Sequence, residues 1–107
     1  MSEKNHTAKI TIDPFLGQVQ LSDKLIKLTN KEYHLLTYFI SNPNKVVTRS
    51  EIINHVWGAE YDGNPRVIDT YIKMIRMKID KDRSIIKTVS KVGYKFEKGR
   101  DLEVKIL

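Results

Sequence analysis

Two segments carry the signature of a helix start, and they most strongly limit how this chain can fold. Residues 29–32 (TNKE) and 48–51 (TRSE) are capping boxes, in which the threonine hydroxyl and the glutamate carboxylate each accept a hydrogen bond from a free backbone N–H. Apolar residues at helical spacing follow each box: Leu35, Leu36, Phe39 and Ile40 after the first, and Ile52, Ile53, Val56 and Trp57 after the second. The sequence therefore predicts two amphipathic helices, ended by residues 41–44 (SNPN) and by Gly58.

A third helix is predicted over residues 64–80 (NPRVIDTYIKMIRMKID). Asn64 suits the N-cap, and Pro65 suits the first helical position because its missing N–H costs nothing there. At about 100° per residue, one narrow stripe of this helix holds Ile68, Ile72, Ile75 and Ile79, with Tyr71 on its flank. We expect the isoleucine stripe to pack into the core.

The opposite side of this helix carries cations and compact or apolar side chains, where a solvated surface would carry charges of both signs. Its members are Arg66, Thr70, Lys73 and Met77, with Val67 and Met74 on one shoulder and Asp69 and Arg76 on the other. In a DNA major groove, cations meet phosphates while threonine, valine and methionine contact base edges and thymine methyl groups. A basic surface helix with two stray methionines is the alternative interpretation.

Short β-strands are predicted on both sides of the helices. Ile10, Ile12, Val19, Leu21 and the residues 25–28 alternate with polar residues around turn signals at Pro14, Gly17 and Asp23, which predicts three antiparallel strands. Residues 85–97 (IIKTVSKVGYKFE) alternate in two runs around Lys91 and Gly93, which predicts a hairpin. Its lysines could reach a minor groove, or they could simply be solvated. For residues 99–107, an added strand and a frayed end both stay open.

Composition narrows the class of protein. The chain of 107 residues has a formal net charge of +6, so polyanions are the first partners to consider. It has no cysteine, which excludes disulfides and thiolate metal sites and is consistent with a cytoplasmic location. No run of about 18 apolar residues could span a membrane. Residues 1–8 are polar and predict a flexible arm or the remnant of a linker, and residues 9–107 predict one domain.

Residues with catalytic or metal-binding potential do not form a recognisable site. His6, His34 and His55 have no metal-like spacing with carboxylates. The aspartates show no paired arrangement typical of general acid–base chemistry, and no serine or histidine stands in a nucleophile motif. We therefore expect no enzyme activity, no metal and no cofactor.

Four segments, in this order and at this spacing, resemble one known family. They are residues 28–36 (LTNKEYHLL), 46–58 (VVTRSEIINHVWG), 66–79 (RVIDTYIKMIRMKI) and 85–97. Together they look like the OmpR/PhoB-type winged-helix effector domain of two-component response regulators, over about residues 9–97. The resemblance implies an α+β fold, a winged helix-turn-helix with an N-terminal antiparallel sheet, three helices and a C-terminal β-hairpin wing.

The resemblance also implies a function. Members of the family are cytoplasmic bacterial proteins that bind double-stranded DNA sequence-specifically and regulate transcription. Residues 65–79 would lie in the major groove as the recognition helix, and residues 85–97 would form the wing. The family usually binds directly repeated half-sites as a head-to-tail pair, so self-association on DNA is expected as well.

Roles of single residues can be carried over to matching positions. The positions that face base edges in the family are Val67, Thr70 and Met74. The positions near the sugar-phosphate backbone are Trp57, Arg66, Tyr71, Lys73, Arg76, Thr88 and Tyr94, while Asp69 would brace a neighbouring arginine. Trp57 and Tyr71 also fit a packing role. Residues 58–64 (GAEYDGN) match a segment that contacts RNA polymerase in some relatives, with Glu60, Tyr61 and Asp62 as candidates.

The chain departs from the family pattern at two places. Ser90 and Lys91 stand where an arginine–glycine pair is common in the wing, which shifts a minor-groove contact to Lys91. Met74 stands where relatives often have arginine, so guanine readout is lost there and the preference leans to A·T-rich sites. The receiver domain that would carry a phosphorylated aspartate is absent from this chain, which is either an excised effector domain or a stand-alone regulator.

Two other functions stay open at this point. A winged helix can be a protein–protein interaction module without DNA binding, in which Val67, Met74 and Met77 would pack against a partner. Single-stranded nucleic-acid binding is less favoured, because only Tyr71 and Tyr94 offer an aromatic platform. The operator, the regulated genes, the inducing signal and the direction of regulation are not encoded in any pattern that we recognise.

Overall fold

A computed structural model of the chain describes residues 8–99 and 101–107. The predicted arm therefore lies outside the described residues except for Ala8, which begins the first strand. In chain order the elements are β1 (Ala8–Asp13), β2 (Gln18–Leu21), β3 (Lys24–Ile26), α1 (Asn30–Ser41), β4 (Val46–Thr48), α2 (Arg49–Ile52), the π-helical turn η2 (Ile53–Trp57), α3 (Val67–Ile79), β5 (Ile86–Val89), β6 (Gly93–Phe96) and β7 (Leu102–Ile106). No helix among the described residues is long and apolar enough to cross a membrane.

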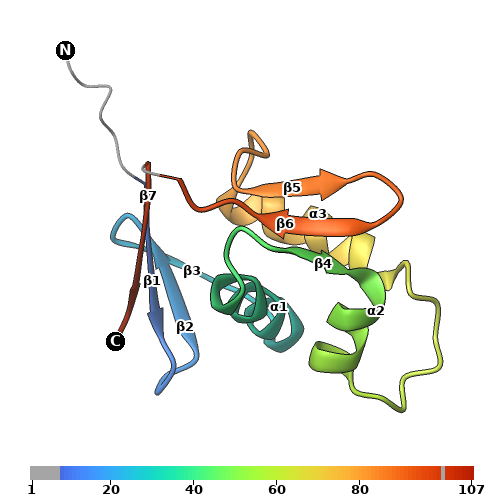
Figure 1. Cartoon of the computed structure of the whole chain (residues 1–107). Coiled ribbons are helices and arrows are strands. Elements are labelled where there is room, and N and C mark those ends of the chain that lie inside the picture. The colour runs from blue at the N-terminus through green and yellow to red at the C-terminus, as the bar shows by residue number, and fades with distance from the viewer. Residues whose placement is uncertain (1–7, 100) are drawn as a thin grey trace.

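The strands form two sheets, with α1 between them (Figure 1). The first sheet has the strand order β3-β2-β1-β7, and the second has the order β4-β6-β5. The predicted antiparallel pairing of β1 with β2 and of β2 with β3 is confirmed. So is the hairpin of β5 and β6, in which Lys87 lies opposite Lys95. The predicted α+β winged-helix architecture, with an N-terminal sheet, three helices and a C-terminal hairpin, is therefore the one observed.

Two strands were not assigned from the sequence. β4 pairs antiparallel with β6, and the close approach explains Gly93: a Cβ at this position would collide with the carbonyl oxygen of Val47. The hairpin turn itself is made by Lys91, whose φ of 65° lies in the left-handed region. The C-terminal segment forms β7, which pairs parallel with β1 from Ala8↔Leu102 to Ile12↔Ile106. The open question about residues 99–107 is thus resolved in favour of an added strand.

The helix starts are as predicted for α1 and α2 and wrong for α3. Both capping boxes are complete, with Thr29 and Thr48 as N-caps. The third helix begins at Val67 with Arg66 at the N-cap position, so the prediction of Asn64 as N-cap and Pro65 as first helical residue is wrong. The reason is a tighter turn before the helix, in which the N–H of Val67 donates to the Asn64 carbonyl at 3.1 Å. The Asn64 side chain still accepts a hydrogen bond, from the Arg66 N–H at 2.9 Å.

The second predicted helix is α-helical for only one turn. After Ile52 the chain widens into η2, and the N–H of Gly58 donates to the carbonyl of Ile53, five residues earlier, at 2.9 Å. Gly58 has a φ of 103° and ends this turn as predicted. Val56 and Trp57 therefore lie in a π-helical turn and not in a regular α-helix.

The core is one apolar cluster between the two sheets and the helices. All four isoleucines of the α3 stripe are buried, and they pack with Leu35, Leu36, Phe39, Ile52, Phe96 and Ile10. This confirms the predicted inward side of α3. Burial of an isoleucine contributes about 1.5–3 kcal/mol to folding, so the stripe fixes the rotation of α3 about its own axis.

One charged pair links α1 to the C-terminal half of α3. Glu32 is fully buried, and its Oε1 accepts hydrogen bonds from the Thr29 N–H at 2.9 Å and from the Lys78 ammonium at 2.6 Å. Its Oε2 has no hydrogen-bond partner among the described residues. Burial by itself raises the pKa of Glu32, but Lys78 and Thr29 lower it more, so the net pKa lies below the ordinary value.

This pair predicts a pH dependence of stability. A carboxyl group whose pKa is lowered on folding stabilises the fold above its unfolded pKa, and that contribution is lost as the pH falls through the folded pKa. At neutral pH we expect Glu32→Gln to lower the free energy of unfolding by about 2 kcal/mol, because the partly exposed Lys78 loses its counter-charge. Below the ordinary glutamate pKa of 4.5 the difference between wild type and variant should shrink. Urea unfolding between neutral pH and pH about 3 measures it.

Glu51→Gln is the matched control, because Glu51 has the same capping-box role but is exposed. Its effect should be smaller at every pH. Parallel stability curves for wild type and Glu32→Gln would contradict the assigned role of the Glu32–Lys78 pair.

Candidate nucleic-acid interface

The outward side of α3 is not covered by any described part of the chain. Arg66, Thr70 and Lys73 are exposed, and so are the apolar side chains of Met74 and Met77, at 42% and 63%. The hairpin of β5 and β6 runs beside the helix, so both elements border one face of the molecule (Figure 1). A helix side that offers cations, a hydroxyl and two uncovered methionines next to a hairpin can enter a groove of an anionic polymer.

The three predicted base-contacting residues differ in accessibility. Thr70 and Met74 are exposed on the outward side of α3. Val67 is half-buried and packs against the core cluster at the N-terminal end of the helix. The structure therefore brings Thr70 and Met74 together on an open surface and leaves Val67 at its border.

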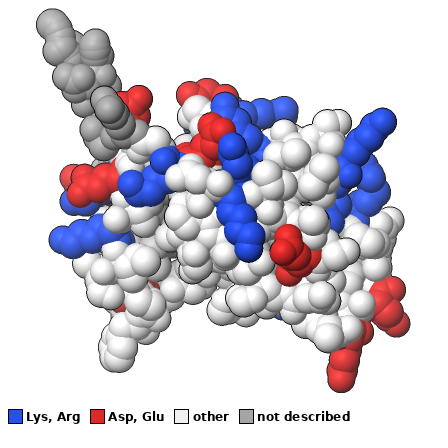
Figure 2. Space-filling view, viewed as in Figure 1, with Lys and Arg blue, Asp and Glu red and all other residues white. Residues whose placement is uncertain are grey.

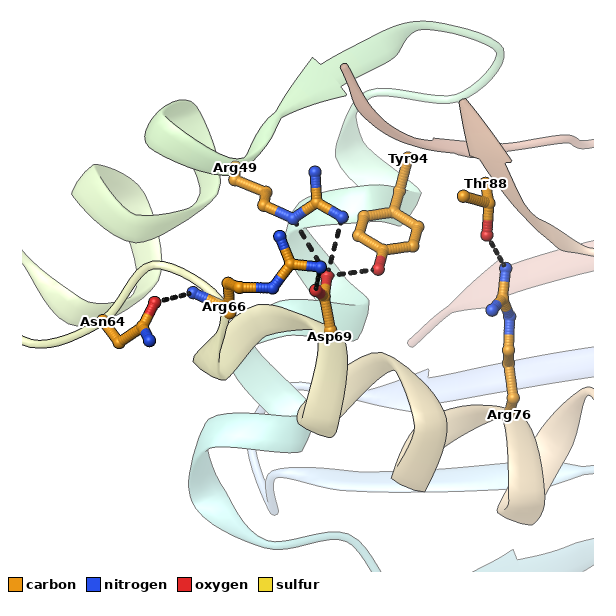
Figure 3. A network of polar contacts seen from close by, with 7 residues as sticks. All are labelled: Arg49, Asn64, Arg66, Asp69, Arg76, Thr88 and Tyr94. Atoms are coloured by element: carbon orange, nitrogen blue, oxygen red, sulfur yellow. Dashed lines mark hydrogen bonds and ion pairs between the residues drawn. The ribbon is translucent and has the colours of Figure 1, made fainter. Parts of the chain in front are cut away.

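Asp69 is the centre of a polar network on the first turns of α3 (Figure 3). Its Oδ1 accepts hydrogen bonds from the Arg49 Nε at 2.9 Å and from the Tyr94 hydroxyl at 2.5 Å. Arg49 also places Nη2 at 2.9 Å from the same oxygen, and Arg66 Nη2 lies 3.6 Å from Oδ2. One carboxylate thus links α2, α3 and β6, and it also pairs with Arg66, three residues earlier in the chain.

The charges in this network reinforce one another. Burial raises the pKa of Asp69, but the hydrogen bonds from Tyr94 and Arg49 lower it further, so the net pKa is below the ordinary value. Burial, followed by the Asp69 carboxylate, raises the pKa of Tyr94, so its phenol stays a donor. The hydrogen bond to Asp69 raises the pKa of Arg49. All three groups therefore hold the protonation states that the network needs at neutral pH.

A second contact ties the hairpin to α3. Arg76 donates through Nη2 to the Ile86 carbonyl at 2.6 Å. The same Nη2 donates to the Thr88 hydroxyl oxygen at 2.9 Å, as Figure 3 shows. Burial, followed by the nearby charge of Arg83, lowers the pKa of Arg76, which remains a cation. Arg76 and Thr88, both predicted backbone contacts, thus bind each other in the free protein, and Tyr94 is nearly buried beneath them.

Two of the residues predicted to contact the DNA backbone, Trp57 and Tyr71, lie close together where η2 packs against α3; we call this place the elbow. The ring of Trp57 lies edge to face with that of Tyr71, with centroids 5.2 Å apart, and 6.2 Å from that of Tyr61. The Lys31 ammonium lies 5.6 Å from the centre of the Trp57 ring. Trp57 and Tyr71 are both half-buried and pack against the core cluster. Each therefore has a packing role and still borders the surface.

The hairpin turn and the loop after η2 carry opposite charges. Ser90 and Lys91 are exposed at the turn between β5 and β6. In the loop, Glu60 and Asp62 are exposed, whereas Tyr61 is half-buried and its hydroxyl donates to the Asn64 carbonyl at 3.2 Å. Figure 2 shows basic groups at the hairpin turn and acidic groups below them, over the loop, while groups of both signs are spread over the rest of this face. An anion would therefore meet the hairpin side of α3 rather than the loop.

Three basic residues near this face were not singled out from the sequence. A hollow between α3 and the hairpin is lined by Lys73, Arg76, Lys81 and Arg83, together with Asp69, Met77 and Tyr94. Lys81 and Arg83 are two of the three, and Arg49 is the third. Arg49 lies in the first turn of α2, where a cation is unfavourable for the helix dipole, and this unfavourable position could have marked it in the sequence. No comparable signal marked Lys81 and Arg83. Among the described residues, no three carboxylate or imidazole side chains are arranged to hold a metal ion.

The chain is similar to known transcriptional regulatory proteins. A family model described as the C-terminal part of transcriptional regulatory proteins matches residues 23–96. The uncharacterized transcriptional regulatory protein YkoG of Bacillus subtilis is 40% identical over 79 residues, which cover 72% of this chain and 35% of YkoG. The heme response regulator HssR of Staphylococcus saprophyticus is 38% identical over 90 residues, covering 82% of this chain and 40% of HssR. The chain thus spans well under half of the length of these relatives.

Two solved structures share the fold over nearly their whole length. The DNA-binding domain of the response regulator AdeR, crystallised with an intercistronic region, has a TM-score of 0.74 and 29% identity, covering 84% of this chain and 95% of that one. The DNA-binding domain of Bacillus subtilis CssR has a TM-score of 0.73 and 27% identity, covering 81% and 98%. The residues that the family model matches, 23–96, include α3 and the hairpin of β5 and β6.

The Asp69 network predicts a specific loss of stability. Asp69→Asn keeps the shape of the side chain but leaves the Arg49 and Arg66 charges without a counter-charge. We expect the free energy of unfolding at neutral pH to fall by about 1–3 kcal/mol. Asp62→Asn removes an equal charge from the exposed loop and should change it by less than about 0.5 kcal/mol. Equal losses for the two variants, measured by urea unfolding, would contradict the role of Asp69.

Proposed function

The chain belongs to the OmpR/PhoB-type family of C-terminal effector domains of transcriptional regulatory proteins, and on that premise we propose that it binds double-stranded DNA sequence-specifically to regulate transcription. The observation that carries the proposal is the outward side of α3, which is exposed and mixes cations with a hydroxyl and two methionines. A net charge of +6 favours the same partner. We infer from such a partner that the protein acts in the bacterial cytoplasm.

In the proposed complex, α3 lies in the major groove. Thr70 and Met74 contact base edges because they are exposed in the middle of the outward side, and Val67 contacts them from its border. Met74 offers an apolar surface that suits a thymine methyl group, which favours A·T pairs at its position. Lys73 and Arg66 lie beside these residues and neutralise phosphates at the rims of the groove.

The hairpin and the elbow hold the DNA backbone on either side of α3. Lys91 is the exposed cation of the hairpin turn, next to Ser90, and it is the group that we assign to the adjacent minor groove. Trp57 and Tyr71 offer an indole N–H and a phenol at the elbow. Arg76, Thr88 and Tyr94 are engaged within the protein, so we assign them chiefly to holding α3 and the hairpin at a fixed spacing.

Two partners beyond DNA belong to the proposal. By analogy with the family, the domain binds direct-repeat half-sites as a head-to-tail pair. The loop residues Glu60, Tyr61 and Asp62 form the candidate contact with RNA polymerase, supported by the exposure of Glu60 and Asp62.

The exposure of Met77 and Met74 favours one rival, a protein–protein interaction module. Gel retardation on random genomic duplexes over a salt series separates the two functions. Phosphate neutralisation predicts clear binding at low salt and a steep linear fall of log K with log salt. A module that only docks on proteins would show little duplex affinity even at low salt, and that result would overturn the proposal.

A pair of variants tests whether Lys73 contacts a phosphate and Thr70 contacts a base edge. Lys73→Ala should weaken binding to every duplex and reduce the magnitude of the salt slope by about one unit, because one phosphate contact is lost. Thr70→Ala should instead change the base preferred at one position of each half-site, as read by selection from randomised duplexes. Lys27→Ala, which removes an equal charge from the exposed residue after β3, is the control for net charge. Equal weakening by Lys73→Ala and Thr70→Ala on all sequences would contradict these roles.

A further inference from the structure

β7 is an edge strand that lies outside the matched family segment. The family model ends at residue 96, whereas β7 spans Leu102–Ile106. β7 pairs parallel with β1 and closes one side of the four-stranded sheet. No strand among the described residues pairs with its other side. An uncovered edge of five residues, without proline or bulge, is a template for another strand.

The direction of the backbone groups shows which residues form this template. The N–H of Ala8 donates to the Asp101 carbonyl at 3.0 Å, and the N–H of Leu107 donates to the Ile12 carbonyl at 2.9 Å. Backbone groups of successive residues point to opposite sides of a strand. Residues 101, 103, 105 and 107 therefore face β1. Leu102, Val104 and Ile106 direct their N–H and C=O groups away from β1, and the Leu102 N–H donates to the Gly99 carbonyl at 3.4 Å.

The sequence of β7 is complementary to itself in the antiparallel direction. If two copies of LEVKI pair about Val104, Leu102 lies opposite Ile106 of the other copy, and Val104 lies opposite Val104. The outward N–H groups of Val104 and Ile106 and the outward C=O groups then face partner groups, because these are the hydrogen-bonded positions of an antiparallel pair. The Leu102 N–H exchanges its long bond to Gly99 for one to Ile106 of the other copy. Glu103 lies opposite Lys105 of the other copy, at the positions where cross-strand side chains approach most closely.

We propose that β7 pairs with β7 of a second copy of this chain, forming a two-fold symmetric dimer with a continuous sheet across both subunits. The pairing satisfies the outward backbone groups and forms two identical Glu103–Lys105 pairs. It also brings the exposed Ile106, at 60%, beside the nearly buried Leu102 of the partner copy. Of the possible occupants of this edge, a second copy is the one whose charges and hydrogen-bonding pattern the strand itself specifies.

The dimer closes instead of growing into a fibre. A two-fold contact uses the same edge on both copies, so no β7 edge is left over. The sheet then ends at β3 on each side, a strand of only three residues with Lys24 in it. Short, charged edge strands resist further pairing. The outward side of α3 and the hairpin turn stay free, because they lie away from β7 (Figure 1).

Association off DNA is the first test. Sedimentation velocity of the wild-type chain from about 10 µM to about 1 mM covers the range in which small interfaces associate. We expect a reversible monomer–dimer equilibrium within this range. Lys105→Glu places two carboxylates opposite each other at both symmetric positions, and it should weaken association by about tenfold. Its neighbour on β1 is Thr11, so contacts within the subunit lose no charge pair.

Mixing two variants gives the decisive result. Glu103→Lys alone places two lysines opposite each other and should also weaken association by about tenfold. In an equimolar mixture of Glu103→Lys and Lys105→Glu, however, every facing pair across the heterodimer has opposite charges, so association should return to the wild-type level. The double variant Glu103→Lys/Lys105→Glu should also self-associate like the wild type.

Folding controls keep the test decisive. Glu103 lies beside Lys9 on β1, so each variant is checked by circular dichroism and thermal unfolding before association is measured. Val104→Pro removes the central outward N–H without removing a hydrogen bond to β1, and it should abolish the dimer while leaving duplex binding intact. A wild-type chain that stays monomeric at about 1 mM, or folded variants whose mixture does not regain association, would overturn the proposal. Neither outcome bears on DNA binding by α3.

Discussion

Burial of the isoleucine stripe of α3 is the constraint on which the rest of the molecule depends. Because Ile68, Ile72, Ile75 and Ile79 all lie in the core, the helix cannot rotate, and its outward side is determined residue by residue. Each buried isoleucine contributes about 1.5–3 kcal/mol, more than the penalties that the exposed methionines and clustered cations impose. Because the packing of the isoleucine side holds α3 in place, the residues of the outward side are free to serve binding instead of folding.

Ion pairs and hydrogen bonds then fix the side chains of the interface on the helix that core packing has oriented. A surface that attracts an anion must hold several cations close together, and in the free protein those cations repel each other. Asp69 offsets this repulsion by pairing with Arg49 and Arg66, and Tyr94 keeps the carboxylate in place from β6. Arg76 instead fixes the hairpin against α3 by donating hydrogen bonds to the Ile86 carbonyl and the Thr88 hydroxyl oxygen. The candidate interface is therefore largely organised before DNA arrives, which lowers the conformational entropy lost on binding.

Sequence reasoning succeeded where the determinant is local and failed where it is not. The capping boxes at Thr29 and Thr48 and the 3.6-residue period of α3 are local patterns, and both are confirmed. The strand β4 is too short to show a period, and it exists because it pairs with β6, about 47 residues later. The Arg49–Asp69 contact likewise joins residues far apart in sequence. The start of α3 was misplaced because the turn at Asn64 competes with a regular N-cap, a balance that composition does not reveal.

The two modes of self-association considered for this chain have different symmetries, and that difference limits what each can do. Direct-repeat half-sites relate two subunits by translation along the duplex and rotation about it, whereas paired β7 strands relate them by a two-fold axis. Two subunits joined through β7 therefore present their α3 helices in opposite orientations, related by the two-fold axis of the pair. Such a dimer cannot occupy adjacent direct repeats with both subunits at once. Pairing through β7 would therefore affect regulation by joining two separate DNA sites or by keeping subunits off a direct repeat. Because β7 lies outside the matched family segment, this mode of self-association would depend on residues that the family model does not include.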